Sequence, residues 1–549
     1  MKRNSIGIFV SIILTFFSLF IYLLSILSAD YHINDWGLIT WFSLGYFLSL
    51  LSLTIAFWLS FVSNPISLIL NTVQILLLIC LLWLTPILLG GLGASPSFST
   101  GLDHFANAEF ISRTGVINTS VSWYQFWPGV SIFGAVIVNV LGLTDFPFLV
   151  SIFPLIVEII SSIPLYLIFK KVLDIQDKRL VFIGIWFFYL CNWVSQDLFS
   201  SQALAYYLFI FILFFLIDGS YAQITESKVC VLIFFTSITI THLFTTLLII
   251  CTLSIFFLFH TRKFQYGIFA LTVIIIAISW QILGCPDFFS QSQGQAVTQI
   301  FQWNLFISKT NIFTHVTSLE SNQISHIQLT FVIIIFLLAL IGFLFKKLFK
   351  DLANDKGIII TFLGIAIYIF CIGNAYGGEL LHRFFLFVLP ILIYFLLKIF
   401  KRESAKYFLL FVLVIFIPLS IFSRYGMANT NYVSKSRLNS VDFLVNNSSG
   451  GQILDVSDYE PVGIWKNEER YHYYYRSKFQ SEDEILAEFD SYASPKFVPI
   501  GTVNKEIFHN VENDRISFNN FIESLDNELK YNKIFSSSDT NYIYENDAR

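Results

Sequence analysis

The stretch Thr100-Gly-Leu-Asp-His-Phe-Ala-Asn-Ala-Glu-Phe-Ile-Ser-Arg113 lies within residues 90–128, a polar loop between two blocks of strongly apolar sequence. It places Asp103, His104, Glu109 and Arg113 within about three helical turns. Thr100 suits the start of a helix and Gly115 its end. The stretch therefore predicts a short helix that lies against a membrane and presents polar, titratable side chains at its surface.

Apolar runs of about 17–25 residues, the length of a transmembrane helix, recur on both sides of this loop. Of the 549 residues, 56% are hydrophobic and only 13% are charged, and the mean hydropathy is +0.70. Beyond residue 424 the sequence becomes polar. We therefore expect an α-helical polytopic membrane domain over residues 1–424 and a soluble, small α/β domain over residues 425–549. Within the latter, strand character marks residues 451–456, 496–500 and 542–544, and residues 518–530 predict a helix.

The apolar run after Lys2 and Arg3 is too long for a signal peptide and lacks a small-residue cleavage site, so it predicts a first membrane span. About 11–13 transmembrane helices are expected in all. The apolar segments are residues 6–28, 38–62, 66–89, 147–169, 180–193, 203–217, 229–259, 266–283, 329–345, 357–372, 384–397 and 407–422.

Lys and Arg gather in short loops, which are cytoplasmic by the positive-inside rule. This orientation puts the N-terminus in the cytoplasm and the C-terminal domain on the extracytoplasmic face of the cell membrane. It also makes two demands. Residues 129–143 must not cross the membrane, and residues 229–259 must cross twice as two short helices that bend at Thr241-His242.

With that topology, most acids and histidines that are not plainly surface residues fall on the outer face. They lie in residues 90–128, in residues 195–202 with Asp197 and Gln202, at Thr241-His242, in residues 284–328, and in residues 374–383 with Glu379, His382 and Arg383. This clustering predicts a functional site on that face.

Asp103 has no basic residue three or four positions away, and the aromatic run Trp123–Trp127 follows it in sequence. One interpretation is a general base that activates an acceptor hydroxyl or amide. The alternative is a solvated loop acid. Glu109 and Arg113 lie one turn apart and form an ordinary ion pair in the simpler reading.

The other candidates have alternatives too. Asp197 caps a helix end if it is not part of the site. His242 within an apolar run implies a polar cavity. Glu158, an acid midway along a span, is either a site residue or paired across the bundle. Arg383 is a membrane-interface anchor or a bidentate ligand for a lipid phosphate.

These features resemble the GT-C glycosyltransferases, polytopic enzymes that use polyprenyl-phosphate-linked sugars. The resemblance is carried by the acid at a helix start in the first large outer loop and by the outer C-terminal domain. It is also carried by three short motifs: Asp197-Leu-Phe-Ser-Ser-Gln-Ala-Leu-Ala-Tyr, Thr241-His242 and Glu379-Leu-Leu-His-Arg-Phe. Uncharacterised prokaryotic and archaeal members are the most similar. The Trp-Trp-Asp-Tyr-Gly signature of oligosaccharyltransferase subunits is absent.

The resemblance implies sugar transfer from a polyprenyl (dolichyl) phosphate donor to a lipid-linked glycan or protein acceptor, with inversion at the sugar carbon. Asp103 is then the catalytic base, and Arg383 with His382 holds the donor phosphate. His104, Glu109, Asp197, Gln202, His242 and Glu379 would line the substrate site. No cofactor is required. The family often has an acidic pair where this chain has Asp103-His104, which leaves a divalent metal as an open question. Three spans precede the acid here, which implies an added N-terminal hairpin.

Two other functions stay open. A lipid or sugar transporter would gather polar residues at the bilayer midplane, and a surface-polysaccharide polymerase or ligase would depend on His382-Arg383 more than on Asp103. The six cysteines form no CxxC pattern and no disulfide framework. Membrane lipid is an expected partner, and nucleic acid is not.

Overall fold

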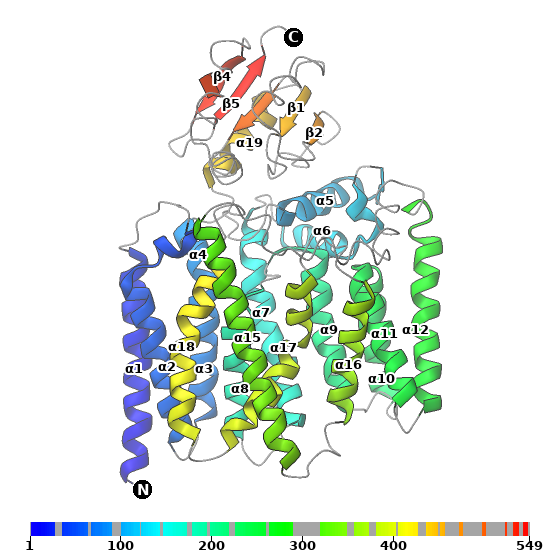
Figure 1. Cartoon of the computed structure of the whole chain (residues 1–549). Helices are drawn as coiled ribbons and strands as arrows, with labels where there is room; N and C mark the ends of the chain where they lie inside the picture. The colour runs from blue at the N-terminus through cyan, green and yellow to red at the C-terminus, as the bar shows by residue number, and fades with distance from the viewer. Residues whose placement is uncertain are drawn as a thin grey trace.

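The computed structural model describes residues 2–27, 36–63, 67–90, 100–120, 122–142, 147–172, 178–194, 198–218, 225–259, 263–288, 319–348, 356–372, 380–401, 405–426, 435–447, 451–455, 471–475, 497–500, 522–523, 531–536 and 542–546. Most of these residues form a bundle of helices (Figure 1). The helices that run along the bundle are α1 (Lys2–Leu27), α2 (Leu44–Val62), α3 (Leu68–Ile79), α4 (Thr85–Gly90), α7 (Pro147–Val172), α8 (Lys178–Cys191), α9 (Ser201–Asp218), α10 (Thr225–Thr239), α11 (Leu243–Phe259), α12 (Lys263–Leu283), α15 (Leu319–Leu348), α16 (Lys356–Ile372), α17 (Leu380–Leu397) and α18 (Lys406–Tyr425).

The bundle has the dimensions and composition of a membrane domain. Among the described residues, six helices are long and apolar enough to cross a bilayer: Ile6–Leu27, Leu44–Val62, Leu68–Leu89, Leu149–Lys171, Gln323–Leu344 and Lys406–Tyr425. Shorter apolar helices stand beside them. Large apolar side chains such as Phe9, Phe16 and Phe20 are more than half exposed on α1, which a hydrocarbon environment explains. The structure therefore agrees with an α-helical, polytopic membrane protein.

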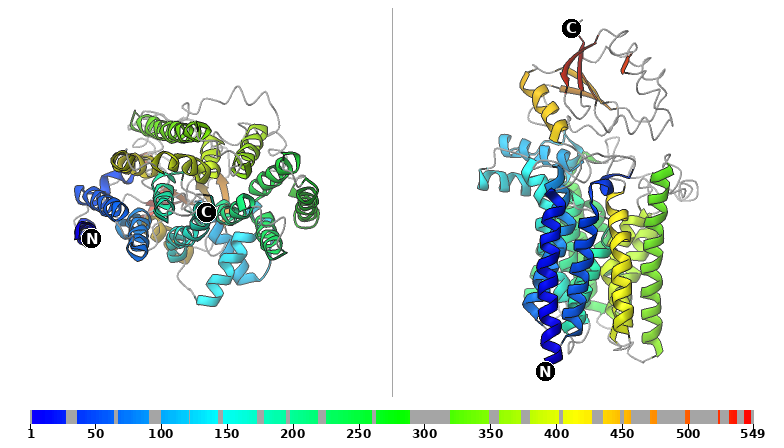
Figure 2. Two further views of the ribbon diagram at one scale, coloured as in Figure 1. Left: turned by 90° about the horizontal axis from the view of Figure 1, so that it is seen from below. Right: turned by 90° about the vertical axis from the view of Figure 1, so that its left-hand side faces the viewer.

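Residues 129–143 and 229–259, on which the predicted topology depends, have the helix arrangement that it needs. Residues 129–143 do not run along the bundle. They form α6 (Gly129–Leu141), which lies across its end together with α5 (Thr100–Thr114), and the pair projects beyond the bundle in side view (Figure 2). Residues 229–259 do form two helices, α10 and α11, and the turn between them contains Thr241 and His242.

The span predicted over residues 38–62 is shorter than expected, because Leu38–Trp41 form a separate turn of 3-10 helix, η1, and α2 begins only at Leu44. Gly37 precedes η1 with φ 61°, a left-handed conformation that glycine adopts without strain. The chain therefore bends here before it enters the membrane-length helix. The first two helices then pack side by side, joined by serine hydrogen bonds such as Ser11 Oγ to Ala56 O at 2.7 Å.

The span predicted over residues 66–89 is interrupted by a π-helical turn, η2 (Cys80–Leu84), between α3 and α4. Pro86 lies in α4 and has no backbone N–H, so it cannot pair with the carbonyl of Leu82 four residues earlier. That carbonyl instead accepts a hydrogen bond from the hydroxyl of Tyr425 at the end of α18. The hydroxyl of Tyr46 donates to the neighbouring Leu81 carbonyl at 3.0 Å. The irregular turn thus ties α3 and α4 to two other helices.

Beyond the end of the bundle that carries α5 and α6 lie α19 (Lys435–Asn447) and a five-stranded sheet (Figure 1). The strands are β1 (Gly451–Asp455), β2 (Tyr471–Tyr475), β3 (Phe497–Ile500), β4 (Tyr531–Ser536) and β5 (Tyr542–Asn546). Their order is β2-β1-β3-β5-β4, with β1 parallel to β2 and β3 and with β5 antiparallel to β3 and β4. The three predicted strand stretches overlap β1, β3 and β5. The helix predicted over residues 518–530 lies outside the described residues except for 522–523.

Candidate functional site

Asp103 lies in the first turn of α5, and the helix ends at Thr114, followed by Gly115 with φ +70°. The predicted end of this helix is therefore correct and has the left-handed residue that such an end requires. Asp103 keeps part of its surface exposed, whereas Leu102, Phe105 and Ala106 around it are buried. Desolvation by this apolar packing raises the pKa of Asp103 from 3.8 to about 7.

The pKa of Asp103 bears on its two interpretations, a general base and a solvated loop acid. A freely solvated acid would keep its ordinary pKa and would be fully ionised at neutral pH. A carboxyl with a pKa of about 7 exchanges its proton near neutral pH, which is the property that a general base or acid needs. The environment of Asp103 is therefore not that of a freely solvated loop acid.

A chain of side-chain hydrogen bonds holds this end of α5. The Asn107 amide donates to the backbone carbonyl of Asp103 at 2.8 Å, and Gln125 donates to Asn107 Oδ1 at 3.0 Å. Gln125 in turn accepts from the backbone N–H of Asn118 at 2.6 Å. Gln125 belongs to η3 (Trp123–Phe126), the short helix formed by the aromatic run. The chain therefore fixes the aromatic segment against the turn that carries Asp103.

His104 is buried, and its ring lies 4.1 Å from the ring of Tyr124, measured between centroids. Burial lowers the pKa of His104 to about 3. Its Nδ1 has no hydrogen-bond partner among the described residues. A neutral, buried imidazole with an unsatisfied nitrogen is a polar group that a ligand can satisfy.

His242 lies in the turn between α10 and α11, where its Nδ1 is 2.8 Å from the hydroxyl of Thr245 and 3.3 Å from the Thr245 backbone nitrogen. The pKa of His242 is lowered to about 3, first by burial and then by the positive charge of Arg383 and by His104. Three residues from three distant segments therefore lie within electrostatic reach of one another. Because the Thr245 N–H donates to Nδ1, the neutral ring carries its proton on Nε2 and can donate from there.

His382 and Arg383 lie in the first turns of α17 rather than before it, because that helix starts at Leu380 and not at residue 384 as predicted. The ring of His382 contacts the ring of Trp193 edge to face, with centroids 5.3 Å apart. Trp193 is the second residue after α8 and is buried. The motif at the start of α17 is thus packed against the end of α8.

The remaining candidates are placed in different ways. Gln202 lies in the first turn of α9, is buried, and has an Nε2 without a partner among the described residues. Glu109 is partly buried on α5, and the Arg113 guanidinium lies 6.0 Å from the centre of the Phe110 ring. Asp197 and Glu379 lie outside the described residues.

Arg424, which the sequence marks only as the end of the membrane domain, is a further buried charged residue of the bundle. Arg424 is 9% exposed, lies 4.1 Å from the centre of the Trp83 ring, and donates to the backbone carbonyls of Tyr189 and Asn192. The sequence does carry a signal for Arg424. It is an arginine in the last turn of an apolar helix, at the end of the bundle where the positive-inside rule disfavours basic residues.

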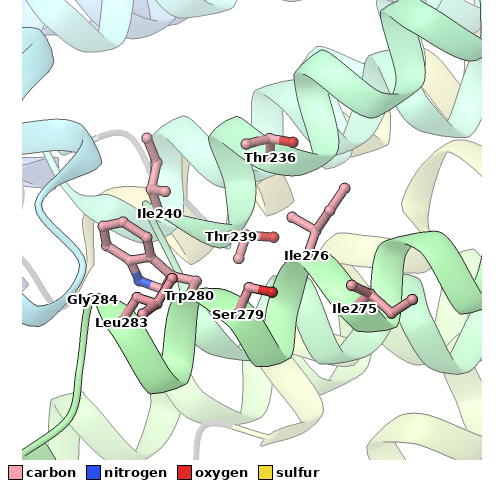
Figure 3. Close-up of a pocket in the computed structure, with 9 residues that line it drawn as sticks. All are labelled: Thr236, Thr239, Ile240, Ile275, Ile276, Ser279, Trp280, Leu283 and Gly284. Carbon is pink, nitrogen blue, oxygen red and sulfur yellow. The ribbon is translucent and has the colours of Figure 1, made fainter.

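A pocket of about 400 Å³ lies between α10 and α12 (Figure 3). Its wall is mostly apolar, with the ring of Trp280 and the side chains of Ile240, Ile275 and Ile276, and with three hydroxyl groups, from Thr236, Thr239 and Ser279. Ile240 stands two residues before His242. The pocket therefore lies next to the turn that carries this histidine.

No group of three His, Cys, Asp or Glu residues suited to a metal ion occurs within the described ranges. Neither a protein-family model nor a curated protein matches the sequence.

Proposed function

We propose that the protein is a membrane glycosyltransferase that moves a sugar from a polyprenyl-phosphate donor to a lipid-linked glycan or protein acceptor, with inversion at the sugar carbon. The resemblance to GT-C enzymes supplies this reaction class. The observation that carries the proposal for this chain is the position of Asp103 among buried apolar neighbours, in the first turn of a helix that lies across the end of the bundle, and its raised pKa agrees with that position. The same end carries His104, His242 and Arg383.

In the proposed reaction, the Asp103 carboxylate takes the proton of an acceptor hydroxyl or amide as the acceptor attacks the anomeric carbon of the sugar. The bond between that carbon and the phosphate oxygen breaks, and the polyprenyl phosphate leaves with the bonding electron pair. Arg383, with His382, stabilises the charge that develops on the phosphate. His242 is neutral and offers an Nε2–H as a further donor. This scheme requires no cofactor.

The pocket between α10 and α12 supports the lipid nature of the donor. It lies between α10 and α12, its lining is mostly apolar, and it adjoins the turn before His242. A hydrocarbon chain that lay in it would bring its phosphate toward His242 and Arg383. An apolar wall with a few hydroxyl groups suits a chain that is hydrocarbon along its length and polar at its end.

The N-terminus and the C-terminal sheet lie at opposite ends of the bundle in Figure 1. With the cytoplasmic N-terminus that the basic loops favour, α5, α6 and the sheet are extracytoplasmic. The proposed transfer then takes place on the extracytoplasmic face.

A lipid or sugar transporter is the second candidate, and one observation favours it: Glu158 is fully buried within α7. Both candidates are tested with purified protein in vesicles that contain a labelled polyprenyl-phosphate sugar. An enzyme attaches the label to the acceptor, whereas a transporter moves the labelled compound across the membrane without cleaving it. Loss of transfer in Asp103→Asn, with transfer intact in Glu226→Gln, supports the enzyme. Glu226 is a suitable control because it is an exposed acid on α10.

A further inference from the structure

Glu158 on α7 and Arg424 on α18 bring opposite charges into the interior of the bundle. Glu158 is fully buried and Arg424 is 9% exposed. An isolated charge within a membrane domain is costly, so such charges occur where the protein compensates them. The contacts of Glu158 and Arg424 therefore show which groups stabilise the two charges.

Asn192, the residue that follows α8, contacts both charged groups. Its side-chain Nδ2 donates to Glu158 Oε1 at 3.3 Å, and its backbone carbonyl accepts from the Arg424 guanidinium. The Tyr207 hydroxyl donates to the same Glu158 oxygen at 2.9 Å, and the Ser161 hydroxyl donates to Oε2 at 3.2 Å. The carboxylate is thus held by α7, α9 and the end of α8 together.

Arg424 contacts the backbone of Asn192 rather than its side chain. It also reaches the carbonyl of Tyr189 at 3.4 Å, so its guanidinium lies at the carbonyl end of α8. The last carbonyls of a helix have no partner within the helix, and the negative end of the helix dipole favours a cation there. The ring of Trp83, 4.1 Å from the guanidinium carbon, adds a cation–π contact.

We propose that Glu158, Asn192 and Arg424 form a charge bridge that positions the segment beyond α8 against the His382-Arg383 motif. The next residue, Trp193, contacts His382, so the position of Asn192 determines where this contact forms. Leu198–Gln202, which follow in the chain, lead into α9 and include the buried Gln202. Glu158 and Arg424 are positioning residues in this account. Their effect on transfer rests on the proposed function, whereas the bridge itself does not.

The bridge is tested in nanodiscs with Glu158→Gln, Arg424→Gln, the double variant and the control Glu226→Gln. Each single change removes one charge and leaves the opposite charge in the interior of the bundle, whereas the double change removes both. Each single variant should therefore give less folded protein than the wild type, and the double variant should give more than either. A double variant that gives no more folded protein than the weaker single variant overturns the charge bridge.

Hydrogen exchange separates positioning from stability without any assay of transfer. Backbone amides of residues 192–194 and 198–202 should exchange about tenfold faster in folded Arg424→Gln and in the double variant, because local opening of this segment becomes easier. Exchange elsewhere in α8 and the exchange of Glu226→Gln should match the wild type. Unchanged exchange at residues 192–194 and 198–202 overturns the positioning role.

Transfer is measured on the same samples. If the wild type transfers sugar, the double variant should have a turnover per folded molecule lower by about tenfold or more, because misplacement of the phosphate contacts is costly. Faster exchange with unchanged turnover overturns the positioning role in transfer. If the wild type transfers no sugar, the proposed function fails while yield and exchange still decide the bridge.

Discussion

The backbone N–H of Gly129 donates to the carbonyl of Ile240 at 3.0 Å, which joins the first residue of α6 to the turn before His242. A Cβ at position 129 would overlap the hydroxyl group of Thr241. The glycine therefore permits a backbone contact that holds the helix pair α5–α6 next to His242. This relationship brings residues more than 100 positions apart in the chain into one site.

A larger residue at position 129 tests this contact. Gly129→Val should destabilise the protein by about 1–3 kcal/mol, the usual cost of overpacking, and should lower transfer more than folded yield. The measurement is thermal unfolding and transfer in detergent. Gly115→Asn is the control, because its φ of +70° suits asparagine and an added Cβ meets nothing within 4 Å. Equal behaviour of the two variants would contradict the role of Gly129.

The raised pKa of Asp103 predicts a stability that falls as pH rises. Between pH 3.8 and about 7 the folded protein holds a proton at Asp103 that the unfolded chain has released. Ionisation in the folded state therefore costs stability, and the full cost applies above about pH 7. Asp103→Asn should have a higher Tm than the wild type at pH 8, and this gain should vanish near pH 4. An equal gain in Tm at pH 4 and pH 8 would contradict burial of the Asp103 carboxylate as the cause of the gain.

Arg383 and His242 are predicted to be electrostatically coupled. The positive charge of Arg383 helps to lower the pKa of His242 to about 3, so Arg383→Gln should raise that pKa. The measurement is the NMR titration of labelled histidine, with His242→Gln used to assign the signal. Burial still lowers the pKa in the variant, so the value should stay below 6.5, the ordinary histidine value. If the pKa of His242 were the same in Arg383→Gln as in the wild type, the two residues would not be coupled and Arg383 would not belong to the site.

The pocket between α10 and α12 can be filled by a larger side chain. Ser279→Trp should reduce transfer from donors with long polyprenyl chains and have less effect on short-chain, water-soluble donors. Ile278→Trp is the matched control, since Ile278 lies next to Ser279 on α12 but is 52% exposed. The rates for both donors, measured for both variants, check this prediction. An equal loss with both donors would indicate general damage rather than a blocked lipid site.

Sequence patterns predicted the helical membrane architecture because apolar length and loop charge are local properties. The division of residues 229–259 into two helices and the position of α6 across the end of the bundle agree with what the Lys and Arg positions predicted. The start of α17 was placed too late, because Leu380 and Leu381 continue the apolar pattern across His382-Arg383. The helix carries this polar pair within it rather than starting after it.

The proximity of His104, His242 and Arg383 could be suspected from topology, but only packing shows that their charges interact. The π-helical turn before Pro86 and the partners of Arg424 depend on contacts between α18 and helices far away in sequence. The raised pKa of Asp103 likewise arises from side chains that bury it, and the sequence around it does not reveal their positions. These features need tertiary structure because their causes are long-range contacts.

The central claim is that Asp103 is the base of a sugar transfer. Its most direct test is transfer from a labelled polyprenyl-phosphate sugar by purified wild type, Asp103→Asn and Glu226→Gln, with folded protein measured in each sample. We predict that Asp103→Asn loses about 100-fold or more of the rate, as expected when a general base is removed, at normal folded yield. Wild-type transfer should rise with pH through about 7, the pKa of Asp103. Transfer by Asp103→Asn at the wild-type rate would contradict the account.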